Sequence, residues 1–334
     1  GHRYAQDRFP IDQTAHPILM SKIVDNLMYG YVLPIPQQFA QIVCNRFVIH
    51  YQEDARGKLR IIYDARILNH FLDYIKFRLP SWRDVMFKFG QDAKVFSIDL
   101  KSAYNQVPIM TASMPFCSFR VPCGKSFKYY AYTSLPFGVS SAPRIFFSLV
   151  KDSIVRFLNS NGWVEQGCAV AFLDDLLIKV GDKSTSVQEC RARMTVIVEF
   201  IAHLGFKLNQ KGSQGVTTAI EWCGMMYDFT NFEIFPGKNR FENCMATLRN
   251  LMESPMVSLS TIETFGGQLA SWGPLNTKFA QCLKAEASDL LSAHRLSSPH
   301  MDPVQYEKSK LSTFVCITRL KQMVTIFFDI LSFK

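Results

Sequence analysis

Three kinds of sequence feature are missing from this chain, and each absence narrows what the protein can be. No apolar run reaches about 18 residues, so we expect no transmembrane helix and no membrane partner. The first residues lack a signal-peptide pattern. The nine cysteines form no Cys-x-x-Cys pair and no Cys/His cluster at zinc spacing. Because an odd, scattered set of cysteines indicates reduced thiols, we expect an intracellular protein, cytoplasmic or nuclear.

What is present is the composition of a globular protein with an excess of basic residues. The 334 residues are 48% hydrophobic and 19% charged, which allows large cores and two or three subdomains. Lysine and arginine number 37 against 28 aspartates and glutamates, so the net charge is +9. This charge favours a polyanionic partner such as nucleic acid, although a basic protein without one has the same composition.

The stretch Val170–Ile178 carries two adjacent carboxylates, Asp174 and Asp175, between two short apolar runs. Alternating apolar residues on both sides predict two strands joined by a tight hairpin turn. Burying charge is costly, so the pair of carboxylates requires an explanation. One interpretation is a solvent-exposed turn. The other is a pair of divalent cations that neutralises the two side chains.

Two other predicted strands carry charged residues at their ends. A hairpin is expected from Arg46–His50 and Leu59–Asp64. Lys58 and Arg60 are two residues apart and project from one face of a strand, which suits a triphosphate or a phosphate backbone. A solvated strand face is the alternative. Asp99 ends a short apolar strand, where the alternative to a functional carboxylate is a helix N-cap.

The remaining pattern is mixed up to about residue 235 and helical beyond it, so we expect a domain boundary there. Serines ahead of Pro143 predict the start of a helix, and apolar residues at helical spacing predict another over 186–204. Further strands are expected at 126–137, 206–209 and 220–226, and further helices at 238–253, 260–272, 275–293 and 304–323.

Taken in order, these motifs resemble those of the reverse transcriptases, from about residue 44 to 272. The segment Phe96–Tyr104 is similar to the first catalytic motif of that family. Leu135–Pro143 resembles the segment that packs under the incoming nucleotide. Phe172–Asp175 stands where the family carries its aromatic-x-Asp-Asp box. The Leu-Pro-Phe-Gly and Leu-Asp-Asp forms most resemble retrotransposon enzymes of the DIRS-like or gypsy-like groups.

The resemblance implies an α+β fold of the right-hand polymerase type. Such a fold has fingers, a palm with an antiparallel sheet and packed helices, and a helical thumb. The implied domains are fingers with an N-terminal extension over 1–93, palm over 94–235 and helical thumb and connection over 236–334. Part of the fingers is then inserted into the palm around 105–135.

The resemblance also implies two-metal-ion catalysis, in which a primer 3′-hydroxyl attacks the α-phosphate of a nucleotide in line. The implied cofactors are two Mg²⁺ ions, with Mn²⁺ as a substitute, because hard cations take oxygen ligands. The implied catalytic residues are Asp99, Asp174 and Asp175. The same three aspartates are the implied metal ligands, together with the carbonyl of Leu100.

The nucleotide-binding residues implied in the same way are Lys58, Arg60, Lys101, Ser102, Ala103, Tyr104, Phe137, Gly138 and Lys211. Lys58 and Arg60 would hold the triphosphate, and backbone amides from Lys101 to Tyr104 would add hydrogen bonds. Tyr104 stands where a bulky ring excludes a 2′-hydroxyl and selects deoxynucleotides, and a core aromatic is the alternative. Lys211 would protonate the pyrophosphate.

The implied primer and template contacts are Arg66, Asn69, Pro143, Phe172, Trp222, Cys223, Gly224, Gly266, Gly267 and Gln268. Trp222–Gly224 resembles the hairpin that positions the primer end, although the family often has Leu-Gly there. Gly266–Gln268 resembles a thumb surface that tracks the minor groove of the duplex. Close packing of helices explains the two glycines equally well.

The implied function is that of an RNA-directed DNA polymerase, a nucleotidyltransferase of a retroelement. Its partners would be an RNA template, a DNA primer, the RNA/DNA duplex and deoxynucleoside triphosphates. Two alternatives stay open. One is a catalytically inactive, domesticated fold that serves as a nucleic-acid-binding scaffold. The other is an RNA-directed RNA polymerase, against which the bulky ring of Tyr104 argues.

Overall fold

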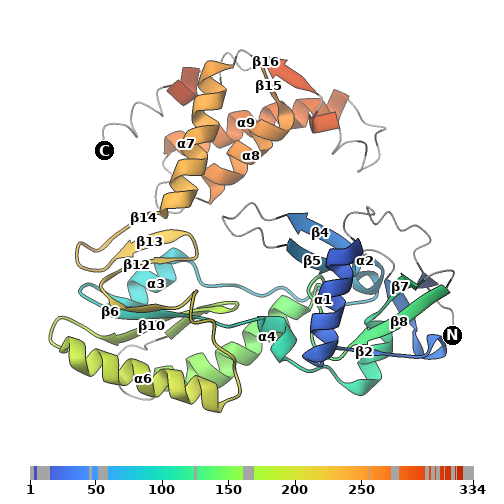
Figure 1. The fold of residues 1–334 in the computed structure, drawn as a ribbon. Helices are drawn as coiled ribbons and strands as arrows, with labels where there is room; N and C mark the ends of the chain where they lie inside the picture. The colour runs from blue at the N-terminus through green and yellow to red at the C-terminus, as the bar shows by residue number, and fades with distance from the viewer. Residues whose placement is uncertain are drawn as a thin grey trace. The chain divides into compact units, whose positions relative to one another are not determined.

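The computed structural model shows a chain of mixed helices and strands (Figure 1). The described residues are 4–5, 16–44, 47–51, 59–123, 126–160, 169–254, 256–271, 278–297, 301, 305, 309–311, 313–316, 320 and 322–325. The chain divides into two compact units, residues 1–81 with 96–216 and residues 82–95 with 217–334. Both units contain helices and sheets, as the expected α+β class requires.

The first unit contains a five-stranded sheet in the order β1-β3-β7-β8-β2. The strands β7 and β8 form an antiparallel hairpin, whereas β3 pairs in parallel with both β1 and β7. The buried rings of Phe119 and Tyr130 stack at a centroid distance of 5.3 Å and contribute to the core. The elements are β1 Tyr4–Ala5, α1 His16–Met28, β2 Val32–Pro34, η1 Gln37–Phe39, β3 Ile42–Cys44, η3 Thr111–Phe116, β7 Ser118–Cys123 and β8 Ser126–Tyr132.

The hairpin expected before Asp64 is confirmed as a separate two-stranded sheet. It consists of β4 Phe47–Tyr51 and β5 Leu59–Tyr63, with Phe47 opposite Tyr63. The short helix α2 Arg66–His70 follows directly. Residues 52–58, including Lys58, lie outside the described residues.

A four-stranded sheet in the order β11-β6-β10-β9 carries the acidic stretch. Its β10 residues Leu176–Ile178 are all fully buried, and since successive side chains point to opposite faces, both faces of this strand are covered. The helix α6 runs along this sheet (Figure 1) and buries Cys190, Ile197 and Ile201. The elements are β6 Lys94–Asp99, η2 Ala103–Gln106, α4 Ala142–Val150, the π-helical turn η4 Lys151–Val155, α5 Arg156–Ser160, β9 Ala169–Phe172, β10 Asp175–Gly181, α6 Val187–His203 and β11 Gln214–Thr217.

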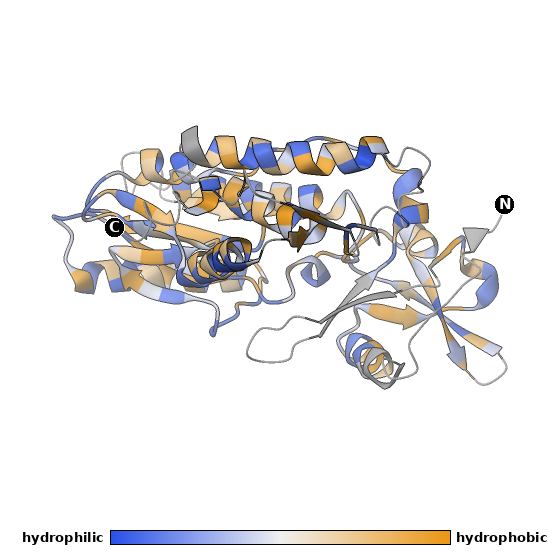
Figure 2. Ribbon diagram, turned by 90° about the horizontal axis from the view of Figure 1, so that it is seen from above, coloured by the Kyte–Doolittle hydropathy of each residue, from blue (hydrophilic) through white to orange (hydrophobic). Residues whose placement is uncertain are grey.

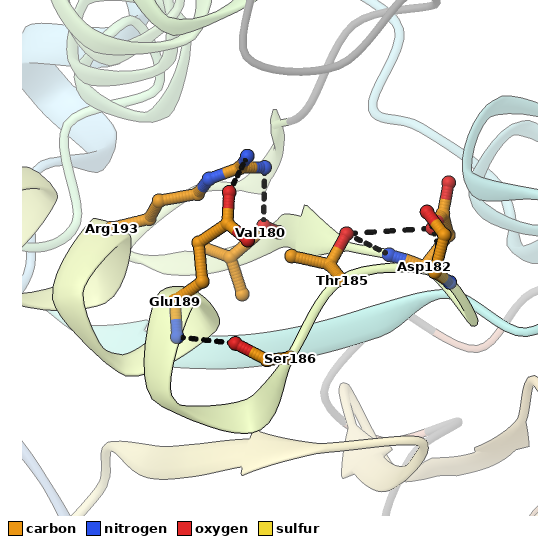
Figure 3. Close-up of polar contacts among 7 residues, drawn as sticks. Val180, Asp182, Thr185, Ser186, Glu189 and Arg193 are labelled. Atoms are coloured by element: carbon orange, nitrogen blue, oxygen red, sulfur yellow. Dashed lines mark hydrogen bonds and ion pairs between the residues drawn. The ribbon is translucent and has the colours of Figure 1, made fainter.

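The connection from β10 to α6 is held by local hydrogen bonds (Figure 3). Ser186 is the N-cap of α6, and its Oγ accepts a hydrogen bond of 3.1 Å from the N–H of Glu189. Arg193 pairs with Glu189 and donates from Nη1 to the carbonyl of Val180 at 2.9 Å. Since Val180 belongs to β10, these contacts anchor the end of that strand opposite to its acidic start.

The second unit combines a three-stranded antiparallel sheet, β12-β13-β14, with four helices among its described residues. Its buried cluster contains side chains from α7, α8 and α9, including the fully buried Leu248, Phe265 and Leu283, together with Val257, Leu320 and Val324. The elements are α3 Trp82–Phe89, β12 Ala219–Trp222, β13 Met225–Asp228, β14 Glu233–Pro236, α7 Lys238–Glu253, β15 Met256–Ser258, α8 Leu259–Ala270, α9 Lys278–Ser297 and β16 Phe314–Cys316.

Three local expectations are wrong. Residues 206–209 form only a single bridge, between Leu100 and Leu208, because the chain then turns around Asp99. Residues 220–226 are not one strand but two. The helix expected over 304–323 is interrupted by β16, which pairs with β15 and satisfies the backbone groups of that short strand. The region beyond residue 235 is therefore not purely helical.

Hydrophobic residues are distributed as in amphipathic elements. Figure 2 shows helices on which hydrophobic and hydrophilic residues alternate along the chain. Two separate clusters of buried apolar side chains result, one in each unit. Among the described helices, none has the length and apolar character needed to cross a membrane.

Candidate active site

The acidic hairpin forms as expected, with a turn of only two residues. Phe172 at the end of β9 pairs with Asp175 at the start of β10, which leaves Leu173 and Asp174 as the turn. Leu173 has a φ of +57°. A positive φ at the first central residue alone is the pattern of a type II′ turn, which normally takes glycine there. A leucine in this conformation is strained, and such strain is concentrated at functional sites.

The end of β6 lies beside this turn. The backbone N–H of Leu100 donates to the carbonyl of Asp174 at 3.0 Å. Partial burial raises the pKa of Asp175 to about 6, and the negative charges of Asp174 and Asp99 contribute to the increase. Asp99 and Asp174 are 75 residues apart in the sequence, yet the three carboxylates are close enough to affect one another's charge. Asp99 makes no cap for η2, whose N-cap is Ser102 without a side-chain hydrogen bond.

Aromatic rings border the carboxylates. Tyr104 contacts Phe137 at a ring-centroid distance of 5.6 Å and Phe146 at 5.5 Å. Burial raises the pKa of the Tyr104 hydroxyl to about 12, and the charge of Asp174 adds to the increase. Tyr104 is only half buried, so it is both a packed aromatic and a wall of the acidic site. Phe137 and Gly138 are exposed beside it.

The donor set suits a divalent cation with a preference for oxygen. The raised pKa of Asp175 reflects its burial first and then the neighbouring negative charges, which Mg²⁺ or Mn²⁺ would neutralise. In the part of the chain that the structure describes, no three His, Cys, Asp or Glu side chains have the geometry to bind one ion together. Magnesium commonly keeps waters and substrate phosphates and takes only one or two protein carboxylates. The residues present fit such a site. The side chain of Leu100 is buried, so only its backbone is available.

The loop that carries Phe137 and Gly138 is held by Asn69. The Asn69 Nδ2 donates to the carbonyl of Gly138 at 3.0 Å, and its Oδ1 accepts from the N–H of Ser140 at 2.8 Å. Both polar ends of the side chain are thus used by the protein itself. Asn69 was expected to contact primer or template, and the structure shows its side chain bracing the loop of Phe137 and Gly138.

Arg66, another expected contact to primer or template, is held by an aspartate that the sequence did not single out. Its Nε and Nη2 donate to the two carboxylate oxygens of Asp64 at 2.8 and 2.7 Å. The Asp64 side chain is 3% exposed and that of Arg66 is 67% exposed. A buried carboxylate therefore orients a guanidinium whose outer surface faces solvent, a bidentate geometry that fixes direction as well as distance.

The remaining expected residues of the first unit are placed as follows. Lys101 and Ser102 are exposed, and Ser102 has a φ of +52°. Ala103 is buried, so its contribution is limited to the backbone. Phe172 is partly buried, Pro143 lies in the first turn of α4, and Lys211 is exposed. For Arg60 the structure describes the backbone, which belongs to β5, and Lys58 lies outside the described residues.

In the second unit, Trp222–Gly224 forms the end of β12 and a two-residue turn into β13. Trp222 pairs with Met225, and its indole is 5% exposed. Cys223 and Gly224 both have positive φ, +50° and +72°, as a type I′ turn requires. The guanidinium of Arg240 covers this turn and donates to the carbonyl of Cys223 at 3.1 Å.

The expected thumb residues lie on α8. A Cβ on Gly266 would meet the Cβ of Ala287 at 3.9 Å, an ordinary packing contact, and a Cβ on Gly267 would meet nothing within 4 Å. The amide of Gln268 donates to the carbonyl of Asn243 at 3.5 Å, and its Oε1 is buried. Gly266 faces another helix, whereas Gly267 is open to the surface.

The sequence analysis did not identify four residues that lie around Asp99 or at the β12–β13 turn. Asn209, Gly212 and Ser213 surround Asp99, and Arg240 covers the turn of the β12–β13 hairpin. A signal existed for the first three. An Asn-x-x-Gly-Ser segment after a helix predicts a tight turn, and a polar turn needs a partner when it lies against a carboxylate.

Known proteins resemble the part of the chain that carries these carboxylates. The family model described as reverse transcriptase (RNA-dependent DNA polymerase) matches residues 51–227, more than half of the chain. The genome polyprotein of petunia vein clearing virus (isolate Shepherd) is 27% identical over 224 residues, 66% of this chain and 9% of that protein. The retrovirus-related Pol polyprotein from transposon 297 of Drosophila melanogaster is 26% identical over 203 residues, 60% of this chain and 18% of that protein.

Solved structures show the same fold at low sequence identity. The foamy viral protease-reverse transcriptase dRH in complex with double-stranded DNA has a TM-score of 0.66 at 16% identity, over 88% of this chain and 46% of that chain. The foamy viral protease-reverse transcriptase in complex with an RNA/DNA hybrid has a TM-score of 0.61 at 17% identity, over 79% and 32%. This chain spans less than half the length of each of these proteins.

Proposed function

Because the chain belongs to the reverse transcriptase (RNA-dependent DNA polymerase) family and has its α+β polymerase fold, we propose that it is the RNA-directed DNA polymerase domain of a retroelement. It is a nucleotidyltransferase that adds deoxynucleotides to the 3′-end of a primer. The retroelement is a retrotransposon of the DIRS-like or gypsy-like type, which its likeness to a Drosophila transposon polyprotein supports.

The observation that carries the proposal is the meeting of three carboxylates at the ends of β6, β9 and β10. Asp174 lies in a strained turn, its carbonyl accepts a hydrogen bond from Leu100, and Asp175 has a pKa raised to about 6 by burial and neighbouring charge. A structural protein gains nothing from such an arrangement, because the like charges destabilise the fold. A polymerase needs the arrangement to bind cations.

The cofactors are two Mg²⁺ ions, for which Mn²⁺ can substitute. When bound, these ions lower the pKa of the attacking 3′-hydroxyl and stabilise the charge on the leaving pyrophosphate. Asp99 and Asp174 are the principal ligands, and Asp175 and the Leu100 carbonyl support them. The chain's own residues orient the reactants in this site.

The nucleotide is held on the side of the carboxylates where Tyr104 and Phe137 lie. Tyr104 excludes a 2′-hydroxyl, so deoxynucleotides are selected, and its contacts with Phe137 and Phe146 keep the ring in place. Lys58 and Arg60 bind the triphosphate with the backbone of 101–104, and Lys211 donates a proton to the leaving pyrophosphate.

The nucleic-acid partners are an RNA template, a DNA primer and their duplex. The foamy viral relatives are described in complexes with double-stranded DNA and with an RNA/DNA hybrid, and the net charge of +9 suits a polyanion. The proposed domains are fingers over 1–93, with a further part inserted around 105–135, palm over 94–235 and helical thumb and connection over 236–334. The protein acts inside the cell, in the cytoplasm or nucleus.

Primer extension on an RNA template tests the proposal. The wild type should extend a DNA primer with deoxynucleotides and Mg²⁺, whereas Asp174→Asn should lose at least about 100-fold in rate, because one neutral amide replaces a ligand of the cations. Asp25→Asn is the matched control, since Asp25 forms only an exposed ion pair with Lys22 and should extend normally.

Two outcomes would contradict the proposal. Wild-type protein that binds the duplex but extends nothing with either Mg²⁺ or Mn²⁺ is an inactive binding scaffold. Wild-type protein that incorporates ribonucleotides as readily as deoxynucleotides is an RNA polymerase, and Tyr104 is then only a packed aromatic.

A further inference from the structure

Asp99 is enclosed by a segment of the chain in which the proposed chemistry uses only Lys211. We propose that Asn209 is a positioning residue for Asp99, which fixes the direction of its carboxylate so that one oxygen is kept for a divalent cation. The inference rests on the proposed function, because it takes Asp99 to be a cation ligand. The segment concerned is 207–213, between α6 and β11.

Asn209 contacts Asp99 at two points. Its side-chain Nδ2 donates to the Asp99 Oδ2 at 2.5 Å, and its backbone N–H donates to the Asp99 carbonyl at 2.8 Å. The side-chain amide nitrogen of asparagine can only donate a hydrogen bond, so the Asp99 carboxylate oxygen is the acceptor. The hydrogen bond holds Oδ2 and leaves Oδ1 for another partner.

Ser213 and Gly212 complete the enclosure. The Ser213 Oγ accepts from the N–H of Asp99 at 3.2 Å and donates to the carbonyl of Asn209 at 3.0 Å. A Cβ on Gly212 would lie 2.2 Å from the Asp99 Oδ2. Any side chain at position 212 would therefore displace the carboxylate from the position in which Asn209 holds it.

The segment stays in place without the Asn209 side chain. The N–H of Lys101 donates to the carbonyl of Lys207 at 2.9 Å, and Leu100 and Leu208 form an antiparallel bridge. Gln106 adds side-chain hydrogen bonds, donating to the carbonyl of Lys207 at 3.1 Å and accepting from its N–H at 2.7 Å. Removal of one side-chain amide should thus leave the backbone register unchanged.

The chemistry of the residue also suits this role. Asp99 lies near two other carboxylates, and an unrestrained side chain would rotate away from their charge. A lysine at position 209 would hold Asp99 through an opposite charge and would compete with the cation for the same oxygens. A neutral amide directs the carboxylate without neutralising it, as hydrogen-bond partners of metal ligands commonly do.

The test compares Asn209→Ala and Asn209→Leu with the wild type. Leucine keeps the volume of asparagine but cannot donate a hydrogen bond. The Mg²⁺ concentration for half-maximal primer extension should rise by roughly 10-fold to 100-fold in both variants. The KM for the deoxynucleotide, measured at saturating Mg²⁺, should change less than about 2-fold, because Asn209 does not contact the nucleotide in this proposal.

A second readout does not depend on activity. Binding of Mn²⁺ to the protein alone, followed by electron paramagnetic resonance, should weaken by a similar factor in both variants. Asn231→Ala is the matched control, because Asn231 donates to Asp228 at 2.8 Å in an exposed turn and should leave Mn²⁺ binding unchanged.

The outcomes separate this inference from the proposed function. Wild-type protein that fails to extend a primer but binds Mn²⁺ with an affinity that falls in both Asn209 variants would support the inference and contradict the polymerase. Extension with an unchanged Mg²⁺ dependence in both variants would overturn the inference alone. Variants that melt at a lower temperature yet bind Mn²⁺ like the wild type would reduce Asn209 to a structural contact and overturn it as well.

Discussion

Two hairpin turns of equal length, one in each unit, solve the same geometric problem in different ways. The β9–β10 turn is Leu173-Asp174, with φ of +57° at the leucine. The β12–β13 turn is Cys223-Gly224, with φ of +50° and +72°. Both turns have a non-glycine residue with positive φ at the first position, but the β12–β13 turn has glycine at the second position, as local turn chemistry favours.

The two turns also differ in what holds them. Arg240 reaches from α7 to the β12–β13 turn, donating to the carbonyls of Cys223 at 3.1 Å and Ser271 at 2.8 Å. The β9–β10 turn is held through the backbone, by the hydrogen bond from Leu100 to Asp174 and by its place between paired strands. A turn that violates its local preference and is held by long-range pairing marks the site where function outweighs stability.

The largest expected effect comes from Arg240→Ala, which removes the side chain that ties the β12–β13 turn to α7 and the end of α8. The free energy of unfolding should fall by about 2–3 kcal/mol, because two carbonyls lose charged hydrogen-bond donors. Chemical denaturation measures the loss.

Lys238→Ala is the control for this variant, since Lys238 is exposed and only approaches Glu242 at 3.9 Å. It should cost less than about 0.5 kcal/mol. Equal effects of the two substitutions would show that the β12–β13 turn does not depend on Arg240.

A smaller effect is expected from Asp175→Asn in metal-free protein. The folded pKa of Asp175 is raised from 3.8 to about 6, so the folded state binds this proton more tightly than the unfolded state. The ionised carboxylate therefore destabilises the fold above pH 6, and the penalty disappears as the pH falls through 6 toward 4. Asp175→Asn should gain about 1 kcal/mol at pH 7.5 and nothing at pH 4, after allowance for partial exposure.

Thermal melts in EDTA at several pH values measure this difference. A gain that is equal at pH 4 and pH 7.5 would mean that the burial and repulsion of the ionised Asp175 carboxylate do not cause it. Addition of Mg²⁺ should stabilise the wild type more than Asp175→Asn, because the cation relieves the same repulsion.

The smallest effect is expected at Leu173. Leu173→Gly relieves the positive φ but increases the freedom of the unfolded chain, so the free energy of unfolding should change by less than about 1 kcal/mol. Leu173→Val should be less stable than the wild type by about 1 kcal/mol, because a β-branched residue tolerates positive φ poorly. The comparison is made by thermal denaturation of the two variants. A valine variant as stable as the glycine variant would show that the turn is not strained.

Much of the fold followed from local patterns. The acidic hairpin, the strand ending at Asp99, the helix starting at Ser186 and the helix over 238–253 were all expected, since each has clear periodicity and end signals. Weak patterns failed. The pairing of β16 with β15 overrode an apparent helical period, and residues 206–209 form only one bridge before the chain turns at Asn209.

The candidate site divides in the same way. The sequence by itself determined which residues carry charge and where strands end, because adjacent carboxylates and apolar alternation are local properties. Only the tertiary structure decided that Asn209 reaches Asp99 and that Asn69 braces the loop at Gly138. Hydrogen bonds between residues as far as 110 positions apart depend on strand order and register, which no local pattern encodes.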